Sequence, residues 1–279
     1  MWAVLLRVGA VSALLYLGLV LVLFLAQRRL LYPSSGRSPW PAEGAIQSAG
    51  LAAWPREAPR EAPRALVAQG ASGAADPARG TVVVFHGNGG NAADRAYYAE
   101  ALVPLGFAVV LAEYPGYGDR PGSPSEAAYV ADARETIRLA HEAFGGPLLV
   151  WGESLGAGVA AQAAPEAGVP VAAVVMLTPW DRLGAVAQEA FPFVPARLVL
   201  RDRYDSVAGL SAYGGPVAVL VAERDEVIPS ARGLALYEAL RGPKRLWTFP
   251  GAGHNSWPLA PEEAWWREVT DWALAPGGR

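Results

Sequence analysis

The 279-residue sequence contains no cysteine and only one lysine, Lys244, among its 23 basic residues. The missing cysteine excludes disulfide frameworks, thiolate metal sites, cysteine nucleophiles and cysteine-linked lipid anchors. The scarcity of lysine accompanies abundant alanine, glycine, proline and arginine, and we interpret it as a coding bias without functional content.

Charge of either sign is also scarce, at 18% of the residues, and the net charge is −3. A strongly basic surface is therefore absent, and we expect no nucleic-acid partner. Hydrophobic residues make up 52% of the chain, which excludes a disordered protein. This fraction exceeds that of most soluble domains, so part of it is expected to lie in a membrane segment.

One uncharged run, residues 8–26, has the length of a membrane span. As a helix rising about 1.5 Å per residue it covers roughly 28 Å, close to the hydrocarbon thickness of a bilayer. A cleaved signal peptide is the main alternative, but its apolar stretch is shorter, and Phe24 stands where a small residue is needed before Ala26. A core helix would not be uncharged on all sides. We therefore expect residues 1–32 to form a retained, single-pass anchor with its flank.

The basic residues beside this run predict its orientation. Arg28, Arg29 and Arg37 follow the run, whereas only Arg7 and the α-amino group precede it. Counting positive charges favours a cytoplasmic catalytic domain.

Residues 33–79 are rich in Pro, Ala, Gly and Ser and contain a tandem Arg-Glu-Ala-Pro repeat at residues 56–63. Because proline at every fourth position prevents a continuous helix, we predict an extended linker with one short strand at Leu66–Ala68.

From Gly80 onward, apolar runs alternate with helix-length segments, which predicts an α/β domain over residues 80–279. Such alternation is typical of a mostly parallel sheet covered by helices on both faces. The runs predicted as strands are Thr81–Phe85, Phe107–Ala112, Pro147–Trp151, Val171–Leu177, Val217–Ala222 and Leu246–Phe249.

A G-x-S-x-G motif, Gly152–Gly156, directly follows one of these runs and precedes a helix of small residues. This is the pattern of a nucleophile elbow, in which Ser154 sits on a sharp strand-to-helix turn. The motif is weak by itself, and a structural Gly-Ser turn is the alternative.

A serine hydroxyl needs a base and a group that orients the base. Among the three histidines, His254 follows the last apolar run in a glycine-rich loop suited to a general base. His86 is expected to support its loop by hydrogen bonds, and His141 to lie on a helix surface.

Asp225 is the predicted acid because it follows the Val217–Ala222 run. The order Ser154, Asp225, His254 is the one expected of an α/β-hydrolase. The alternative acids are Glu223 and Glu226, with Asp202 and Asp205 as weaker candidates.

Two backbone N–H groups are predicted to stabilise the oxyanion of an acyl-transfer transition state. One belongs to Leu155, directly after the nucleophile, and the other to Asn88 in the glycine-rich loop Gly87–Gly90. A phosphate cradle is the alternative for that loop, but neither the P-loop nor the Rossmann spacing is present. We expect no cofactor and no metal ion.

Together these segments resemble the membrane-anchored branch of the α/β-hydrolase superfamily, which is related to the yeast bud-emergence hydrolases and animal protein depalmitoylases. The matching segments are Gln27–Pro33, His86–Asn91, Glu113–Gly118, Gly152–Gly156, Thr178–Trp180, Arg201–Ser206, Asp225–Pro229 and Gly253–Asn255. The resemblance implies a serine hydrolase of ester or thioester bonds with Ser154, Asp225 and His254 as its triad. The chain departs from the family in two places. Glu113 and Pro115 replace an Asp and an Arg, and the Arg-Glu-Ala-Pro linker stands where relatives usually carry a strand pair.

Residues 178–215 contain Trp180, Phe191 and Phe193 and are predicted to form a cap that lines an acyl pocket. A hydrophobic helix pair that closes the core is an equal alternative. With an anchor beside it, such a pocket suits lipid-like acyl substrates such as lysophospholipids, monoacylglycerols or S-acylated proteins. A serine peptidase and an inactive membrane-tethered scaffold are the other functions that we consider.

Overall fold

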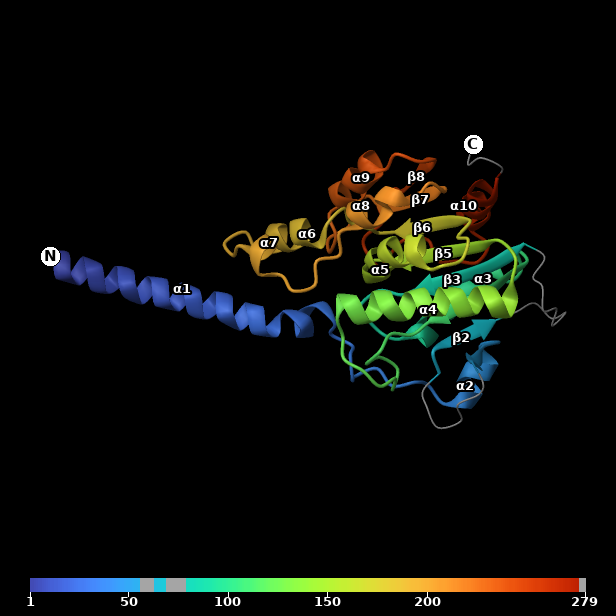
Figure 1. Ribbon diagram of the computed structural model, residues 1–279, viewed down its shortest axis with the longest axis horizontal. Helices are drawn as coiled ribbons and strands as arrows, with labels where there is room; N and C mark the ends of the chain where they lie inside the picture. Colours follow the sequence, from blue (N-terminus) through green and yellow to red (C-terminus); the bar gives the residue numbers. More distant parts are fainter. Residues whose placement is uncertain (56–62, 69–78, 276–279) are drawn as a thin grey trace.

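The computed structural model describes residues 1–55, 63–68 and 79–275. A long N-terminal helix projects from a domain in which helices pack on both faces of one sheet (Figure 1). The predicted α/β architecture, with a mostly parallel sheet and an N-terminal apolar helix, is thus confirmed.

The sheet is 8-stranded, in the order β1-β2-β4-β3-β5-β6-β7-β8. Strand β2 is antiparallel to both of its neighbours, and all the other neighbouring pairs are parallel. The strands are β1 (Ala52–Trp54), β2 (Ala65–Ala68), β3 (Gly80–Phe85), β4 (Phe107–Ala112), β5 (Leu148–Glu153), β6 (Ala173–Leu177), β7 (Val217–Ala222) and β8 (Lys244–Phe249).

The side chains of each central strand alternate between two hydrophobic clusters, one on each face of the sheet. On β3, Val83 and Phe85 belong to the cluster beneath α4 (Glu126–Phe144), α5 (Leu155–Ala163) and α9 (Ser230–Ala239). Val82 and Val84 belong to the cluster beneath α3 (Ala96–Leu102) and α10 (Ala264–Leu274). Strands buried on both faces explain why the sequence shows continuous apolar runs.

Shorter helices connect these elements. They are α2 (Glu43–Ser48), η1 (Ala92–Arg95), η2 (Ala164–Glu166), α6 (Leu183–Ala190), α7 (Ala196–Val199), α8 (Ser206–Gly209) and η3 (Leu210–Ala212). Helices α6 and α7 lie between β6 and β7 in the chain and beside the domain end of α1 in space (Figure 1).

Helix α1 (Trp2–Leu31) contains the apolar run expected to be an anchor. Among the described helices it alone is long and apolar enough to cross a membrane, and none of its apolar window is buried. Its side chains are exposed on all sides until the last turns, where Leu23, Phe24, Gln27 and Leu31 become half-buried. The helix therefore contacts the domain mainly through its C-terminal turns. Further back, the hydroxyl of Tyr16 donates to the carbonyl of Phe193 at 3.0 Å.

The linker interpretation of residues 33–79 is wrong for the parts that the structure describes. This region contains α2 and the strand pair β1 and β2, so the expected strand at Leu66–Ala68 is confirmed as part of β2. Leu66 is fully buried opposite Leu111 of β4. The sequence did not indicate this pairing because the strands are short and rich in alanine, and their stability comes from the sheet edge that they join. Residues 56–62 of the Arg-Glu-Ala-Pro repeat lie outside the described residues.

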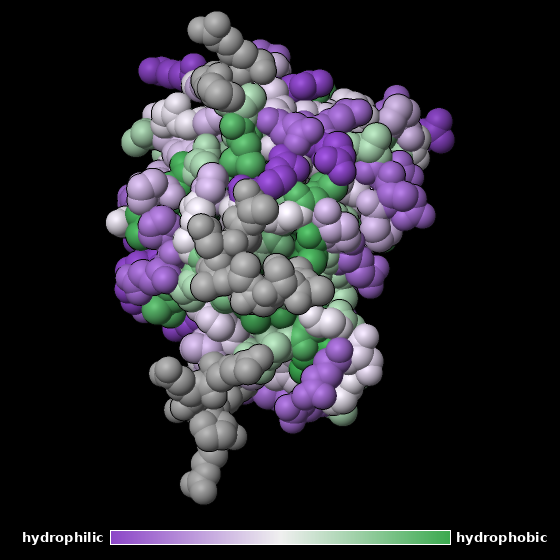
Figure 2. Space-filling model, turned by 90° about the vertical axis from the view of Figure 1, so that its right-hand side faces the viewer, coloured by the Kyte–Doolittle hydropathy of each residue, from purple (hydrophilic) through white to green (hydrophobic). Residues whose placement is uncertain are grey.

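The end of the domain opposite α1 has a different surface from that helix. Hydrophilic side chains occupy much of what is visible there, with hydrophobic ones between them (Figure 2). The large exposed apolar residues are instead concentrated on α1, where Leu5, Leu14 and Leu25 are 58%, 68% and 68% exposed to solvent.

Candidate active site

Ser154 occupies the sharp turn between β5 and α5, with φ at 52° and ψ at −111°. This left-handed backbone is strained for a residue with a Cβ and costs about 1–3 kcal/mol. A Cβ on Gly156 would lie 1.9 Å from the carbonyl oxygen of Phe85, and one on Gly152 would lie 2.3 Å from that of Gly156. The two glycines of the motif are thus required because the turn presses α5 against β3 and β5.

The structure brings Ser154, His254 and Asp225 together at the carboxyl ends of β5, β8 and β7. The Nε2 atom of His254 lies 3.0 Å from the Oγ of Ser154, and its Nδ1 lies 2.7 Å from the Oδ2 of Asp225. Because a carboxylate only accepts, Nδ1–H donates to Asp225 and Nε2 is left to accept the serine proton. Ser154 and His254 are each 8% exposed.

The loop after β7 orients Asp225 itself. Its Oδ1 accepts the N–H groups of Val227 at 2.9 Å and Ile228 at 2.7 Å, while Oδ2 faces His254. Both oxygens are therefore engaged, and hydrogen bonds to the ionised form stabilise it.

None of the alternative acids contacts the side chain of His254. Glu226 accepts the backbone N–H of His254 and Glu223 accepts that of Gly251, so both hold the loop that carries the base. Asp202 binds Arg28, and Asp205 binds Arg182.

The backbone N–H groups of Leu155 and Asn88 donate no hydrogen bond within the described part of the chain. Leu155 begins α5 directly after the nucleophile. The loop that carries Asn88 passes beside Ser154, since a Cβ on Gly87 would lie 3.6 Å from the Cβ of Ser154. The hydroxyl of Tyr117 donates to the carbonyl of Asn88 at 2.9 Å and helps to fix this loop.

Comparisons with known proteins identify the family to which the chain belongs. A family model described as "Serine aminopeptidase, S33" matches residues 76–201. Uncharacterized protein Rv2307c of Mycobacterium tuberculosis is 35% identical over 259 residues, covering 90% of this chain and 88% of that protein. Lysophosphatidylserine lipase ABHD12 of Danio rerio is 29% identical over 184 residues, covering 59% of this chain and 48% of that protein.

Among solved structures, the monoacylglycerol lipase of Paleococcus ferrophilus matches with a TM-score of 0.55 and 22% identity, over 76% of this chain and 98% of that chain. The chain belongs to the α/β-hydrolase superfamily. Its similarity to ABHD12 supports the membrane-anchored branch.

In this α/β-hydrolase, His86 and Glu113 form a buried pair next to the glycine-rich loop Gly87–Gly90, the predicted oxyanion loop. The Nδ1 of His86 lies 2.6 Å from the carbonyl oxygen of Gly87, so it must carry a proton, and Nε2 lies 2.9 Å from the Oε1 of Glu113. Glu113 also accepts the N–H groups of Ala92 and Tyr114. The pair supports the loop as expected, with Glu113 in the place of the family's Asp.

A second polar cluster fixes Glu153, the residue before the nucleophile. Its carboxylate accepts hydrogen bonds from Arg95, Tyr97 and Tyr98. Burial raises the pKa of Tyr98 well above its ordinary value, and the charge of Glu153 raises it further. Tyr98 therefore stays protonated and donates to Glu153. These hydrogen bonds fix the end of β5 directly before Ser154.

The segment just after the anchor, residues 33–40, lies against the oxyanion loop, a contact that no sequence pattern indicated. The N–H of Gly90 donates to the Oγ of Ser34 at 2.9 Å. The side-chain amide of Asn91 donates to Ser38 and to the carbonyl of Pro39. This post-anchor segment is therefore part of the support of the site.

The aromatic residues expected to line an acyl pocket take three different positions. Trp180 is 2% exposed and donates its indole N–H to the carbonyl of Tyr204, so it belongs to the core. Phe193 is 87% exposed. Phe191 is 44% exposed and lines a pocket that is formed with α1. Within the described residues, no group of three or more His, Asp or Glu side chains is arranged to hold a metal ion.

We predict that Gly156→Ala lowers the free energy of unfolding by about 1–3 kcal/mol, because the new methyl group overlaps the carbonyl oxygen of Phe85. Thermal unfolding of the purified protein measures the effect. Gly214→Ala is the control, since a Cβ at Gly214 meets nothing within 4 Å. Equal melting temperatures for the two variants would contradict the tight contact at the elbow.

Proposed function

We propose that the protein is a membrane-anchored serine hydrolase that cleaves ester or thioester bonds of acyl substrates. The observation that carries the proposal is the continuous chain of hydrogen bonds from Asp225 through His254 to Ser154. The membership of a hydrolase superfamily supports the same reaction class.

In the proposed mechanism, the Oγ of Ser154 attacks the substrate carbonyl while the Nε2 of His254 takes its proton. The N–H groups of Leu155 and Asn88 receive the negative charge that develops on the carbonyl oxygen. The protonated His254, stabilised by Asp225, then gives its proton to the leaving alcohol or thiol. Water repeats the sequence on the acyl-enzyme and releases the acid.

The lipid-like substrate class is supported by the apolar helix α1 and by the names of related proteins. One relative is a lysophosphatidylserine lipase, and one structural neighbour is a monoacylglycerol lipase. We propose that residues 8–26 cross the membrane and that the domain from Gly80 onward carries the catalytic site. The peptidase alternative is favoured only by the description of the matching family model.

A fluorophosphonate probe tests the nucleophile. We predict that it labels the full-length protein and that Ser154→Ala abolishes the labelling, because only this serine has a hydrogen-bonded base among the described residues. Ser211→Ala is the matched control, since Ser211 is an exposed serine that should leave labelling intact. A wild-type protein that stays unlabelled would instead favour the inactive scaffold.

Asp225→Asn tests the role of the acid. We predict a fall in kcat for p-nitrophenyl ester hydrolysis of about 10⁴-fold, because the amide no longer selects the tautomer whose Nε2 accepts the serine proton. Glu223→Gln is the comparison, since Glu223 binds only the backbone of the histidine loop. A small loss in Asp225→Asn would mean that another group orients His254.

We further propose that the catalytic domain faces the cytoplasm, on the support of the arginines that follow the apolar run. Because the sequence contains no cysteine, a maleimide can react only with the thiol of a single introduced cysteine. Glu262 is an exposed position at which to introduce it. We predict that a membrane-impermeant maleimide labels Glu262→Cys only after the cells are permeabilised. Labelling of intact cells to the same extent would reverse the orientation.

A further inference from the structure

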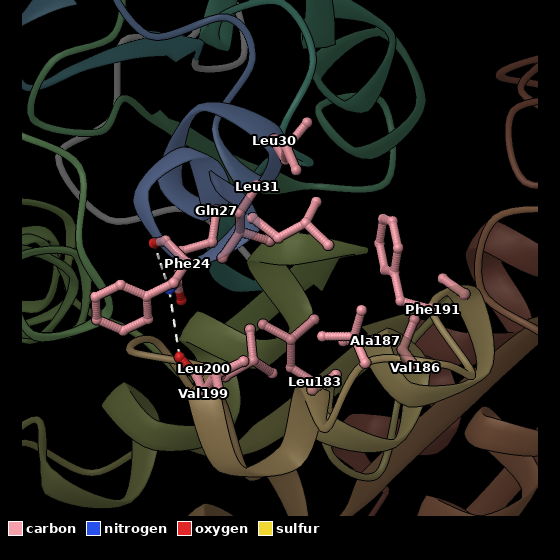
Figure 3. Close-up of a pocket in the computed structure, with 14 residues that line it drawn as sticks. Phe24, Gln27, Leu30, Leu31, Leu183, Val186, Ala187, Phe191, Val199 and Leu200 are labelled. Carbon is pink, nitrogen blue, oxygen red and sulfur yellow. Dashed lines mark hydrogen bonds between the residues drawn. The ribbon is translucent and has the colours of Figure 1, made fainter. Parts of the chain in front are cut away.

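A groove of about 210 Å³ separates the last turns of α1 from the segment formed by α6 and α7. In Figure 3 the side chains of Leu30 and Leu31 lie on the α1 side, and those of Leu183, Val186 and Phe191 on the other. The full lining is Leu23, Phe24, Gln27, Leu30, Leu31, Leu183, Val186, Ala187, Ala190, Phe191, Val194, Ala196, Val199 and Leu200. We call this space the anchor groove.

The anchor groove offers almost no polar group to an occupant. Gln27 is its only polar side chain. The Nε2 of Gln27 donates to the carbonyls of Phe24 at 2.8 Å and Val199 at 3.3 Å, and its Oε1 accepts the N–H of Arg201 at 2.7 Å. Because both ends of the amide are used within the protein, the groove selects for hydrocarbon.

One end of the anchor groove adjoins the proposed oxyanion loop. The carbonyl of Leu31 accepts a hydrogen bond from the Nδ2 of Asn88 at 3.1 Å. Leu31 also packs against the hydrophobic cluster that contains Leu183 and Leu155, the residue after the nucleophile. At the other end, Leu23 and Phe24 belong to the apolar run proposed to cross the membrane. The lining therefore extends from Leu31, which is hydrogen-bonded to the proposed oxyanion loop, to the apolar run proposed to cross the membrane.

Polar contacts hold α1 in place as a wall of the groove. Arg28 binds both carboxylate oxygens of Asp202, at 2.8 and 3.0 Å. The hydroxyls of Tyr32 and Tyr204 lie 3.1 Å apart in the interior. With Gln27 also bonded to α7, the end of the helix is fixed on the domain rather than joined to it by a flexible link.

We infer that the anchor groove holds the acyl chain of a single-chain lipid ester while its carbonyl lies at Ser154, and that α1 helps to determine chain-length preference. The inference rests on the proposed function. The groove is somewhat larger than the roughly 150 Å³ hydrocarbon-lined cavity that accommodates benzene, which leaves room for part of one chain but not for two. The remainder of the chain stays in the bilayer beside α1, so the substrate reaches the serine without exposing its tail to water.

The test narrows the groove from the helix side in the full-length protein. We expect Leu23→Trp to lower the ratio of kcat/KM for the C12 over the C2 p-nitrophenyl ester about tenfold or more, as loss of a fitted apolar contact does. Leu25→Trp is the matched control. Leu25 is two residues away on α1, 68% exposed and outside the lining, so its ratio should equal that of the wild type.

A second pair of variants narrows the groove from the other wall. Ala190→Trp in α6 should lower the same ratio, whereas Leu198→Trp in α7, at a position 79% exposed and outside the lining, should not. If Leu23→Trp and Ala190→Trp both lower the C12 over C2 ratio, the cause is filling of the groove rather than local damage to one helix.

Three outcomes would overturn the inference. If both esters are hydrolysed through Ser154 but the ratio is the same in all four variants, the acyl chain lies elsewhere and only the proposed function stands. If Leu23→Trp changes the molar mass in light scattering instead of the ratio, the groove is an interface between copies of the chain. If the Ser154→Ala variant keeps the wild-type activity, the proposed function fails first.

Discussion

The close approach of α5 to β3 is the constraint on which the site depends. The carbonyl oxygen of Phe85 occupies the space that a side chain on Gly156 would need, so the helix starts directly at the sheet. This contact forces Ser154 into a left-handed backbone and holds its Oγ above the carboxyl ends of the strands. The same approach brings the loop after β3 beside Ser154, since a Cβ on Gly87 would lie 3.6 Å from the Cβ of Ser154. One packing contact therefore positions both Ser154 and the loop that carries one of the proposed oxyanion donors.

The loop after β3 is also where the anchor and the domain meet. Asn88 binds the last turn of α1 through its side chain, and Gly90 binds Ser34 of the post-anchor segment. From the other side, Arg28 of α1 reaches Asp202, whose carboxylate also accepts the N–H of Glu126 at the start of α4. Helix α1, which we propose to span the membrane, is thus joined to the loop proposed to bind the oxyanion and to the segment that precedes α8.

The sequence predicted the parts of this arrangement that depend on local chemistry. The G-x-S-x-G motif and the apolar runs before Ser154, Asp225 and His254 indicated which residues meet at the strand ends, since parallel strands place their carboxyl ends on one edge. The grouping of these three residues in space is what those patterns led us to expect. Long-range partners gave no such signal. Glu126 accepts the N–H groups of Arg203 and Tyr204, 77 and 78 residues away, and no spacing in the chain announces that bond.

The wrong interpretation of residues 33–79 as a linker also has a physical cause. Strand β1 was interpreted as linker, and β2 was expected only as an isolated short strand, because three or four residues rich in alanine carry little β-propensity by themselves. Their backbones are paired because β4 would otherwise present an open edge, and unpaired backbone groups at a buried edge are costly. The residues of a short strand do not reveal that a distant strand, here β4, has a free edge with which it can pair.

The last turns of α1 show why the helix is more than a hydrophobic tether. A helix that only crossed a bilayer would need apolar residues on every side and no particular face. Leu23, Phe24, Gln27 and Leu31 instead recur at the spacing of one helical face, and this face is half-buried against the domain. Gln27 would be unfavourable in lipid without a partner, yet its amide is fully bonded to α7, Arg201 and its own helix. The uncharged run has the length and composition of a membrane span, and the stripe of residues within and after it packs against the domain.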